Sequence, residues 1–239
     1  MRSLIIVLIA IVAMVSSNQI AVGQTQGRST RSTTTLSNSD ISGGLKEALF
    51  QGVRSAINDL GRQNGFLDNA RVRIPLPGGL QKTEKALRAA GQGPRVDAFI
   101  ASMNHAAEKA VPIALNVFLD SIKQMTFTDA RNILFSNQQD AATQFFRRTS
   151  EDRLREMFRP IVQDVTEQVG VTQQYKAMMG KYGAFGKLFG QDATDLDGYI
   201  TQKALDGLFL LIADQEAKIR KDPLGQTTSI LRRVFGSIR

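Results

Sequence analysis

The densest group of side chains that could do chemistry is the arginine-rich stretch FFRRT, residues 145–149. Arginine suits planar recognition of carboxylates and phosphates. Glu151 stands four residues before Arg155, a helical spacing at which local ion pairs consume charge. Arg147 and Arg148 have no equally close acidic neighbour by this reading. The pair is therefore predicted either to bind an anion or to form a buried structural ion pair.

The sequence DLDG, residues 195–198, resembles the centre of a calcium-binding loop. With Gly198 at the sixth position, Asp195 and Asp197 take the third and fifth. The first position is then Ala193 and the twelfth is Ala204, so two expected carboxylates are missing. We expect no metal here, and Asp197 is instead predicted to cap the following helix.

The chain has a single histidine, His105, and no cysteine. The helical pattern places His105 opposite the apolar side of its helix, as a solvent-exposed residue. Without a second histidine or a thiolate, neither a common metal site nor a Ser-His-Asp arrangement is indicated. The sequence assigns no catalytic residue, metal or cofactor, and it offers no disulfide or lipid-bearing cysteine.

The N-terminus has the layout of a secretory signal peptide. An apolar run, Leu4–Val15, follows a basic start, and small residues precede the expected cleavage before Gln24. An uncleaved N-terminal anchor is the alternative. Residues 24–35 are Ser/Thr-rich and are predicted to be a linker, and residues 36–239 form one helical domain. We expect export to the periplasm, with secretion as the alternative and no membrane span after cleavage.

The net charge of +8 is confined to the two ends of the chain. Residues 37–217 balance to zero, whereas a nucleic-acid-binding protein carries a basic face on its folded body. We therefore expect no nucleic acid. The C-terminal part is instead predicted to carry a basic patch, made by Lys218, Arg220, Lys221, Arg232 and Arg233.

These residues must be positioned by helices, because apolar side chains recur at three- and four-residue spacing along most of the chain. The pattern predicts an all-α fold of about eight helices. Pro112 lies within the clearest of these helices, over residues 96–118, and should kink or break it near residue 110. The stretch TSED, residues 149–152, is predicted to start a fresh helix, because it combines capping residues with acids.

One segment departs from this pattern, the extended strap at residues 71–77. Its apolar residues alternate with arginines and prolines, and proline cannot donate to a sheet ladder. We expect Ile74 and Leu76 to pack onto the helices, with Arg71 and Arg73 facing outward and no catalytic residue in the strap.

The last segment is predicted to be a short basic amphipathic helix over residues 228–235. At 100° per residue, its apolar side chains occupy an arc of about 140°. It is expected to dock onto its own domain with Arg232 and Arg233 on the solvent side, or to lie on an anionic membrane surface. The apolar residues are Ile230, Leu231, Val234, Phe235 and Ile238.

Several blocks in fixed order resemble a bacterial family catalogued as domain of unknown function 4197. They are GLKEAL (44–49), VRIPLP (72–77), KQMTFTDARNIL (123–134), ATQFFRR (142–148), VGVTQQY (169–175), KYG (181–183) and KALDGLF (203–209). The resemblance covers about residues 36–236. It implies a helical, exported bacterial protein and no assigned activity.

The leading functional hypothesis is a non-catalytic exported envelope protein that binds a protein partner or an anionic envelope component. The alternative is an enzyme, or a carrier of a hydrophobic ligand, with a pocket between helices near residues 72–77 and 123–148. Its candidate polar groups are Lys123, Asp129, Arg147 and Arg148.

Calcium should not stabilise the protein, because the loop at 193–204 lacks its terminal ligands. We expect the same melting temperature with millimolar calcium and with a chelator, followed by circular dichroism. A rise of several degrees with calcium, reversed by the chelator, would contradict this.

Overall fold

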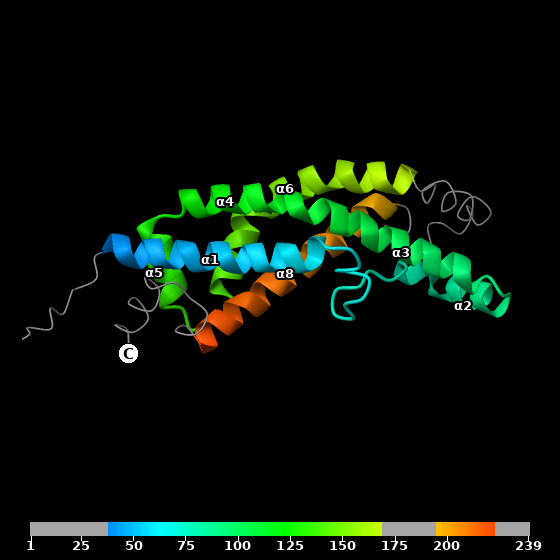
Figure 1. Cartoon of the computed structure of the whole chain (residues 1–239), viewed down its shortest axis with the longest axis horizontal. Helices are drawn as coiled ribbons and strands as arrows, with labels where there is room; N and C mark the ends of the chain where they lie inside the picture. Colours follow the sequence, from blue (N-terminus) through cyan, green and yellow to red (C-terminus); the bar gives the residue numbers. More distant parts are fainter. Residues whose placement is uncertain (1–37, 169–194, 223–239) are drawn as a thin grey trace, which may run out of the picture. The chain divides into compact units, whose positions relative to one another are not determined.

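The computed structural model describes residues 38–168 and 195–222, all within the unit Leu36–Arg239 (Figure 1). The described ranges contain α-helices and short 3-10 turns and no strand, so the predicted all-α class is confirmed. None of these helices has the length and apolarity of a membrane span. The predicted signal peptide, linker and C-terminal helix lie outside the described residues, as do Arg232 and Arg233.

Within the described ranges, five segments build the core, and two short helices, with the 3-10 turn η1, flank it. The core segments are α1 (Asn38–Gly61), α3 (Gly93–Ala110), α4 (Ala114–Gln124), α6 (Ala141–Gln168) and α8 (Leu196–Lys221). The flanking elements are η1 (Gly78–Leu80), α2 (Gln81–Ala89) and α5 (Phe127–Leu134).

The core segments form an up-down-up-down arrangement in which α3 and α4 together make one member. Near its start, α1 reaches the end of α4, where Lys46 Nζ donates to the Lys123 carbonyl at 3.3 Å. Beyond its other end, the backbone N–H of Asn64 donates to Glu108 of α3. These two contacts make α1 antiparallel to α3 and α4, and Figure 1 shows them alongside one another.

Pro112 breaks the long central segment, as its position predicts. Helix α3 ends at Ala110, the 3-10 turn η2 covers Val111–Ile113, and α4 begins at Ala114. Proline has no N–H for the helical hydrogen bond and its ring crowds the preceding turn. A Cβ on Gly61 would lie 3.1 Å from the Pro112 ring, so the end of α1 abuts the break.

Residues 149–152 do not begin a helix, so that prediction is wrong. Helix α6 runs without interruption through them and contains Pro160 as well. The Thr149 hydroxyl donates to the Phe145 carbonyl at 2.9 Å, and the Ser150 hydroxyl lies 2.6 Å from that of Ser121 on α4. Both side chains therefore bond within the helix or across to its neighbour instead of capping a terminus.

The cap of α8 is Asp195 and not Asp197, which corrects a second prediction. Asp195 Oδ1 accepts a hydrogen bond from the Gly198 N–H at 2.9 Å, and its other oxygen pairs with Arg159. Asp197 lies in the first turn, where it accepts from the Thr166 hydroxyl of α6 at 2.9 Å. Both carboxylates are thus engaged in joining α8 to α6.

The strap at 71–77 lies as the alternation predicts. Ile74 and Leu76 are buried, and Arg71 and Arg73 are exposed. The buried side-chain amide of Asn104 pairs with both backbone groups of Ile74, accepting from its N–H at 2.8 Å and donating to its carbonyl at 2.9 Å. A side chain of α3 therefore replaces the neighbouring strand that an extended backbone otherwise needs.

A buried carboxylate holds the turn that joins α1 to the strap. Glu108 on α3 accepts hydrogen bonds from the backbone N–H groups of Asn64, Phe66 and Leu67, at 3.0, 3.1 and 3.3 Å. His105 Nε2 lies 3.1 Å from Asn64 Oδ1. His105, on α3, thus contacts this turn and is only partly exposed, whereas the sequence predicts a solvent-exposed residue.

Replacing Asn104 with alanine should destabilise the protein by about 3 kcal/mol. The buried N–H and carbonyl of Ile74 would each lose a partner, at roughly 1–3 kcal/mol per unsatisfied group. The measurement is urea unfolding. Asn116→Ala, at an exposed site on α4, is the matched control and should change stability by no more than about 0.5 kcal/mol. Equal effects of the two substitutions would contradict the role given to Asn104.

Candidate docking site at the α5 end

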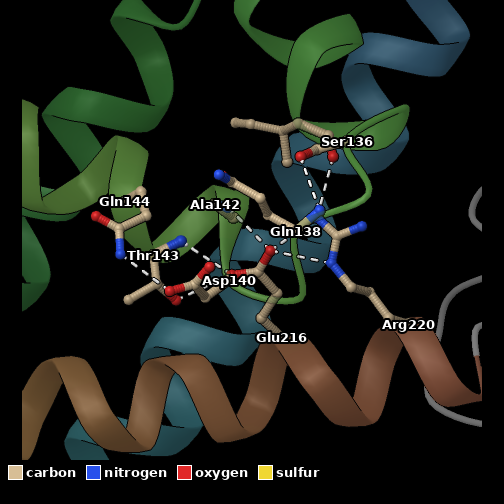
Figure 2. Close-up of polar contacts among 9 residues, drawn as sticks. Ser136, Gln138, Asp140, Ala142, Thr143, Gln144, Glu216 and Arg220 are labelled. Carbon is tan, nitrogen blue, oxygen red and sulfur yellow. Dashed lines mark hydrogen bonds and ion pairs between the residues drawn. The ribbon is translucent and has the colours of Figure 1, made fainter.

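The N-terminus of α6 is capped from another helix, by Glu216 of α8 (Figure 2). One carboxylate oxygen accepts from the Ala142 N–H at 2.9 Å, and the other accepts from the N–H and the hydroxyl of Thr143, both at 2.9 Å. The first N–H groups of a helix have no partner within it, and the helix dipole favours a negative charge there. Glu216 is therefore a structural cap that joins α8 to α6.

Arg220 completes this cluster and extends it to α5. Its Nε and Nη2 donate to Glu216 at 3.1 and 2.8 Å, and Nη2 also donates to the Ile133 carbonyl at 3.0 Å. Ile133 lies near the C-terminus of α5, where carbonyls lack helical partners. Glu216 thus satisfies N–H groups at the start of α6, and Arg220 satisfies a carbonyl at the end of α5.

Beside this cluster lies a small open groove of about 30 Å³ between α1, α5, α6 and α8. A pocket for a drug-sized ligand measures roughly 300–1,000 Å³, so this groove is too small for a carried hydrophobic molecule. Its walls are almost entirely apolar. The lining residues are Leu45, Ala48, Leu49, Ile133, Leu134, Ala142, Glu216, Ile219 and Arg220.

Helix α5 presents apolar side chains to solvent next to the groove. Phe127 is 37% exposed and Phe135, directly after the helix, is 57% exposed. Together with Arg131 and Leu134 they are spaced at i, i+4, i+7 and i+8, which puts them on one face. We call these four residues the α5 face. Leu134 also lines the groove, so the two apolar surfaces are continuous.

Asp129, a candidate polar group, belongs to the cap of α5. Its carboxylate accepts from the Thr126 N–H at 3.0 Å, and the Thr126 hydroxyl accepts from the Asp129 N–H at 3.1 Å, forming a capping box. The Thr126 hydroxyl and then its N–H lower the pKa of the Asp129 carboxyl, burial opposes them, and Arg148 adds a smaller charge effect. The carboxylate is therefore charged at neutral pH and committed to the helix start.

Arg147 and Arg148 lie close to aromatic rings of the core. The Arg147 guanidinium is 4.4 Å from the centre of the Phe209 ring and forms an ion pair with Glu151 at 3.2 Å. Arg148 lies 5.7 Å from the centre of the Phe145 ring. The sequence reading missed the partner of Arg147, because Glu151 is also four residues after it.

Other basic residues that the sequence analysis named as candidates lie at the same end of the unit. Lys123, at the end of α4, and Lys218 and Lys221, in the last turn of α8, are exposed. Arg220 instead turns inward to Glu216. No group of three or more His, Cys, Asp or Glu side chains in the described ranges is placed to hold a metal ion.

Sequence reasoning missed Glu216 and the two exposed phenylalanines. Glu216 stands four residues after Ile212, within the apolar stripe of α8, as Asn104 follows Ile100 on α3. A polar residue at a core position of a stripe signals a buried hydrogen-bonding role. No comparable pattern in the sequence indicates that Phe127 and Phe135 are exposed, because their exposure depends on which neighbouring helices cover α5.

Comparison with known families identifies the chain. The family described as Protein of unknown function (DUF4197) matches residues 35–236. The chain belongs to this family. No curated protein and no solved structure matches it. For this DUF4197 protein the match supports the grouping made from the sequence blocks, while the family description gives no activity.

Glu216→Gln should destabilise the protein by about 3 kcal/mol. The glutamine amide keeps one acceptor oxygen, but its NH₂ group would face N–H or O–H donors of Thr143 or Arg220. Breaking a buried ion pair costs roughly 3–5 kcal/mol. Urea unfolding measures the effect. Glu156→Gln, at an exposed position of α6, is the matched control and should be nearly neutral. A neutral result for Glu216→Gln would rule out the trans-capping role.

Proposed function

We propose that this DUF4197 protein is a non-catalytic envelope protein that binds a protein partner through the α5 face. The partner segment carries apolar side chains for Phe127, Leu134 and Phe135 and an acidic group for Arg131. The observation that carries the proposal is the exposure of Phe127 and Phe135, which lie at the two ends of the short helix α5. Aromatic residues and arginine are enriched at protein interfaces and supply many of their hot spots.

The charge around this face favours an acidic partner. Arg131, Lys123 and Arg148 are exposed at or near α5, while the buried Glu216 is neutralised by Arg220. Asp129 is held in the capping box and lies near Arg148. Charges at the rim of an interface steer a partner and set its orientation more than they add to affinity.

An enzyme or a hydrophobic-ligand carrier has less support. Of its candidate polar groups, Arg147 is paired with Glu151 and Asp129 caps α5, which leaves Lys123 and Arg148. The strap contacts α3 at Asn104 and α8 at Tyr199 and Asp214. Residues 123–148 meet the start of α1, and they contact α8 at Phe209 and Arg220. The envelope location rests on the export signal read from the sequence.

A photoreactive benzoylphenylalanine in place of Phe135 tests the partner directly. It keeps an aromatic ring at the proposed contact and should yield a discrete protein adduct in intact cells. The same group at Ala89, exposed on α2, is the matched control and should not yield that adduct. Arg131→Glu in the Phe135 background should reduce the adduct at least several-fold, because it reverses the charge at the centre of the face.

The result that would overturn the proposal is an identical adduct pattern at positions 135 and 89, or none at either. Flotation of the purified full chain with anionic vesicles at low salt distinguishes a lipid surface from a protein. Vesicle binding that depends on Phe127 and Phe135, without a protein adduct, would assign the face to the membrane.

A further inference from the structure

We propose that the groove between α1, α5, α6 and α8 is covered by residues 230–238 of the same chain. This inference concerns the surface that adjoins the α5 face and shares Leu134 with it. It does not rest on the proposed partner, because the occupant belongs to the same chain. The occupant is a segment of stated sequence, so the inference can be tested without knowledge of the partner.

The position at which the chain leaves α8 is the first argument. The helix ends at Lys221 with Asp222 as its cap, and Ile219 and Arg220 in its last turn already line the groove. Pro223 follows and cannot continue the helix. From Asp222 to Ile230 the chain has eight steps, which span at most about 28 Å. Residues 230–238 therefore start within reach of the groove.

The chemistry of the two surfaces is the second argument. The groove wall is made by aliphatic side chains of α1, α5 and α8, and it stays open to solvent. The segment needs a cover of this kind, because its apolar side chains share one arc of a helix when spaced at 100°. Burying each one stabilises by roughly 1.5–3 kcal/mol. A shallow groove suits the tips of a few side chains and not a whole ligand.

The covalent connection of this segment to α8, through residues 223–229, favours it over a foreign occupant of the groove. Arg232 and Arg233 lie outside the apolar arc and would face solvent near Lys218 and Lys221. Like charges there weaken docking, but exposed charges are screened over about 8 Å at physiological salt. A short connection gives the segment a millimolar effective concentration, which a free peptide or a second copy reaches only when abundant.

The absence of cysteine from the chain allows a direct test. Leu134→Cys places a single thiol at the rim of the groove, where Leu134 is partly exposed. In the full chain the thiol should react slowly with a maleimide. Adding Val234→Ser and Phe235→Ser should raise the rate about tenfold, as expected when docking leaves the groove open roughly one-tenth of the time.

Arg232→Ser with Arg233→Ser is the matched control, because it changes two residues of the same segment outside the arc. It should leave the rate unchanged or lower it, since fewer like charges favour docking. Equal rates in the unmodified, apolar-changed and arginine-changed proteins would overturn the proposal. So would a rate that depends on protein concentration, which would assign the groove to a second copy.

A cross-linking experiment gives a second readout in the folded full chain. A short bifunctional maleimide should join Leu134→Cys to Ser237→Cys, which lies at the edge of the arc. It should not join Ala89→Cys on α2 to Ser237→Cys. Cross-linking of both pairs to the same extent would contradict docking in the groove. A negative result in this experiment does not bear on the partner proposed for the α5 face, because the photo-cross-link from position 135 reports a separate contact.

Discussion

The trans cap formed by Glu216 is the interaction on which the arrangement of this protein depends. A helix of 28 residues, α6, begins with N–H groups that only a carboxylate from α8 satisfies. The same carboxylate orients Arg220 toward the last turn of α5. Three helices are therefore fixed at one point, and the neighbouring groove and α5 face take their positions from it. An uncapped, buried helix start would leave polar groups without partners.

Two further buried polar side chains act in the same way at the other end of α1. Asn104 supplies both hydrogen bonds that the extended backbone at Ile74 needs, and Glu108 holds the N–H groups of the preceding turn. The chain has no disulfide to fix these non-helical segments. Satisfied polar contacts from α3 do so instead, and the Tyr199 hydroxyl adds a bond to the Pro75 carbonyl. The strap therefore has a structural explanation.

The use of polar side chains in these structural contacts bears on the function of the protein. Polar groups that a reader of the sequence would assign to chemistry, Asp129 and Arg147 among them, are engaged in caps and ion pairs. Within the described residues, an apolar helix face with basic neighbours is exposed, and it is continuous with a shallow groove. Such a surface favours the proposed polypeptide partner over a small molecule, since it offers area and anchors in place of an enclosed volume.

The sequence by itself determined the helical class, the break at Pro112 and the inward side of the strap, because periodicity and proline geometry act over a few residues. It misplaced a helix start at 149–152 and the cap of α8, because hydroxyls and carboxylates that suit a cap also suit contacts to a neighbouring helix. Only the tertiary structure decided that Glu216 caps Ala142, 74 residues away, and that Phe127 and Phe135 stay exposed. Both outcomes depend on which helix lies alongside, and that is set by packing of the whole core.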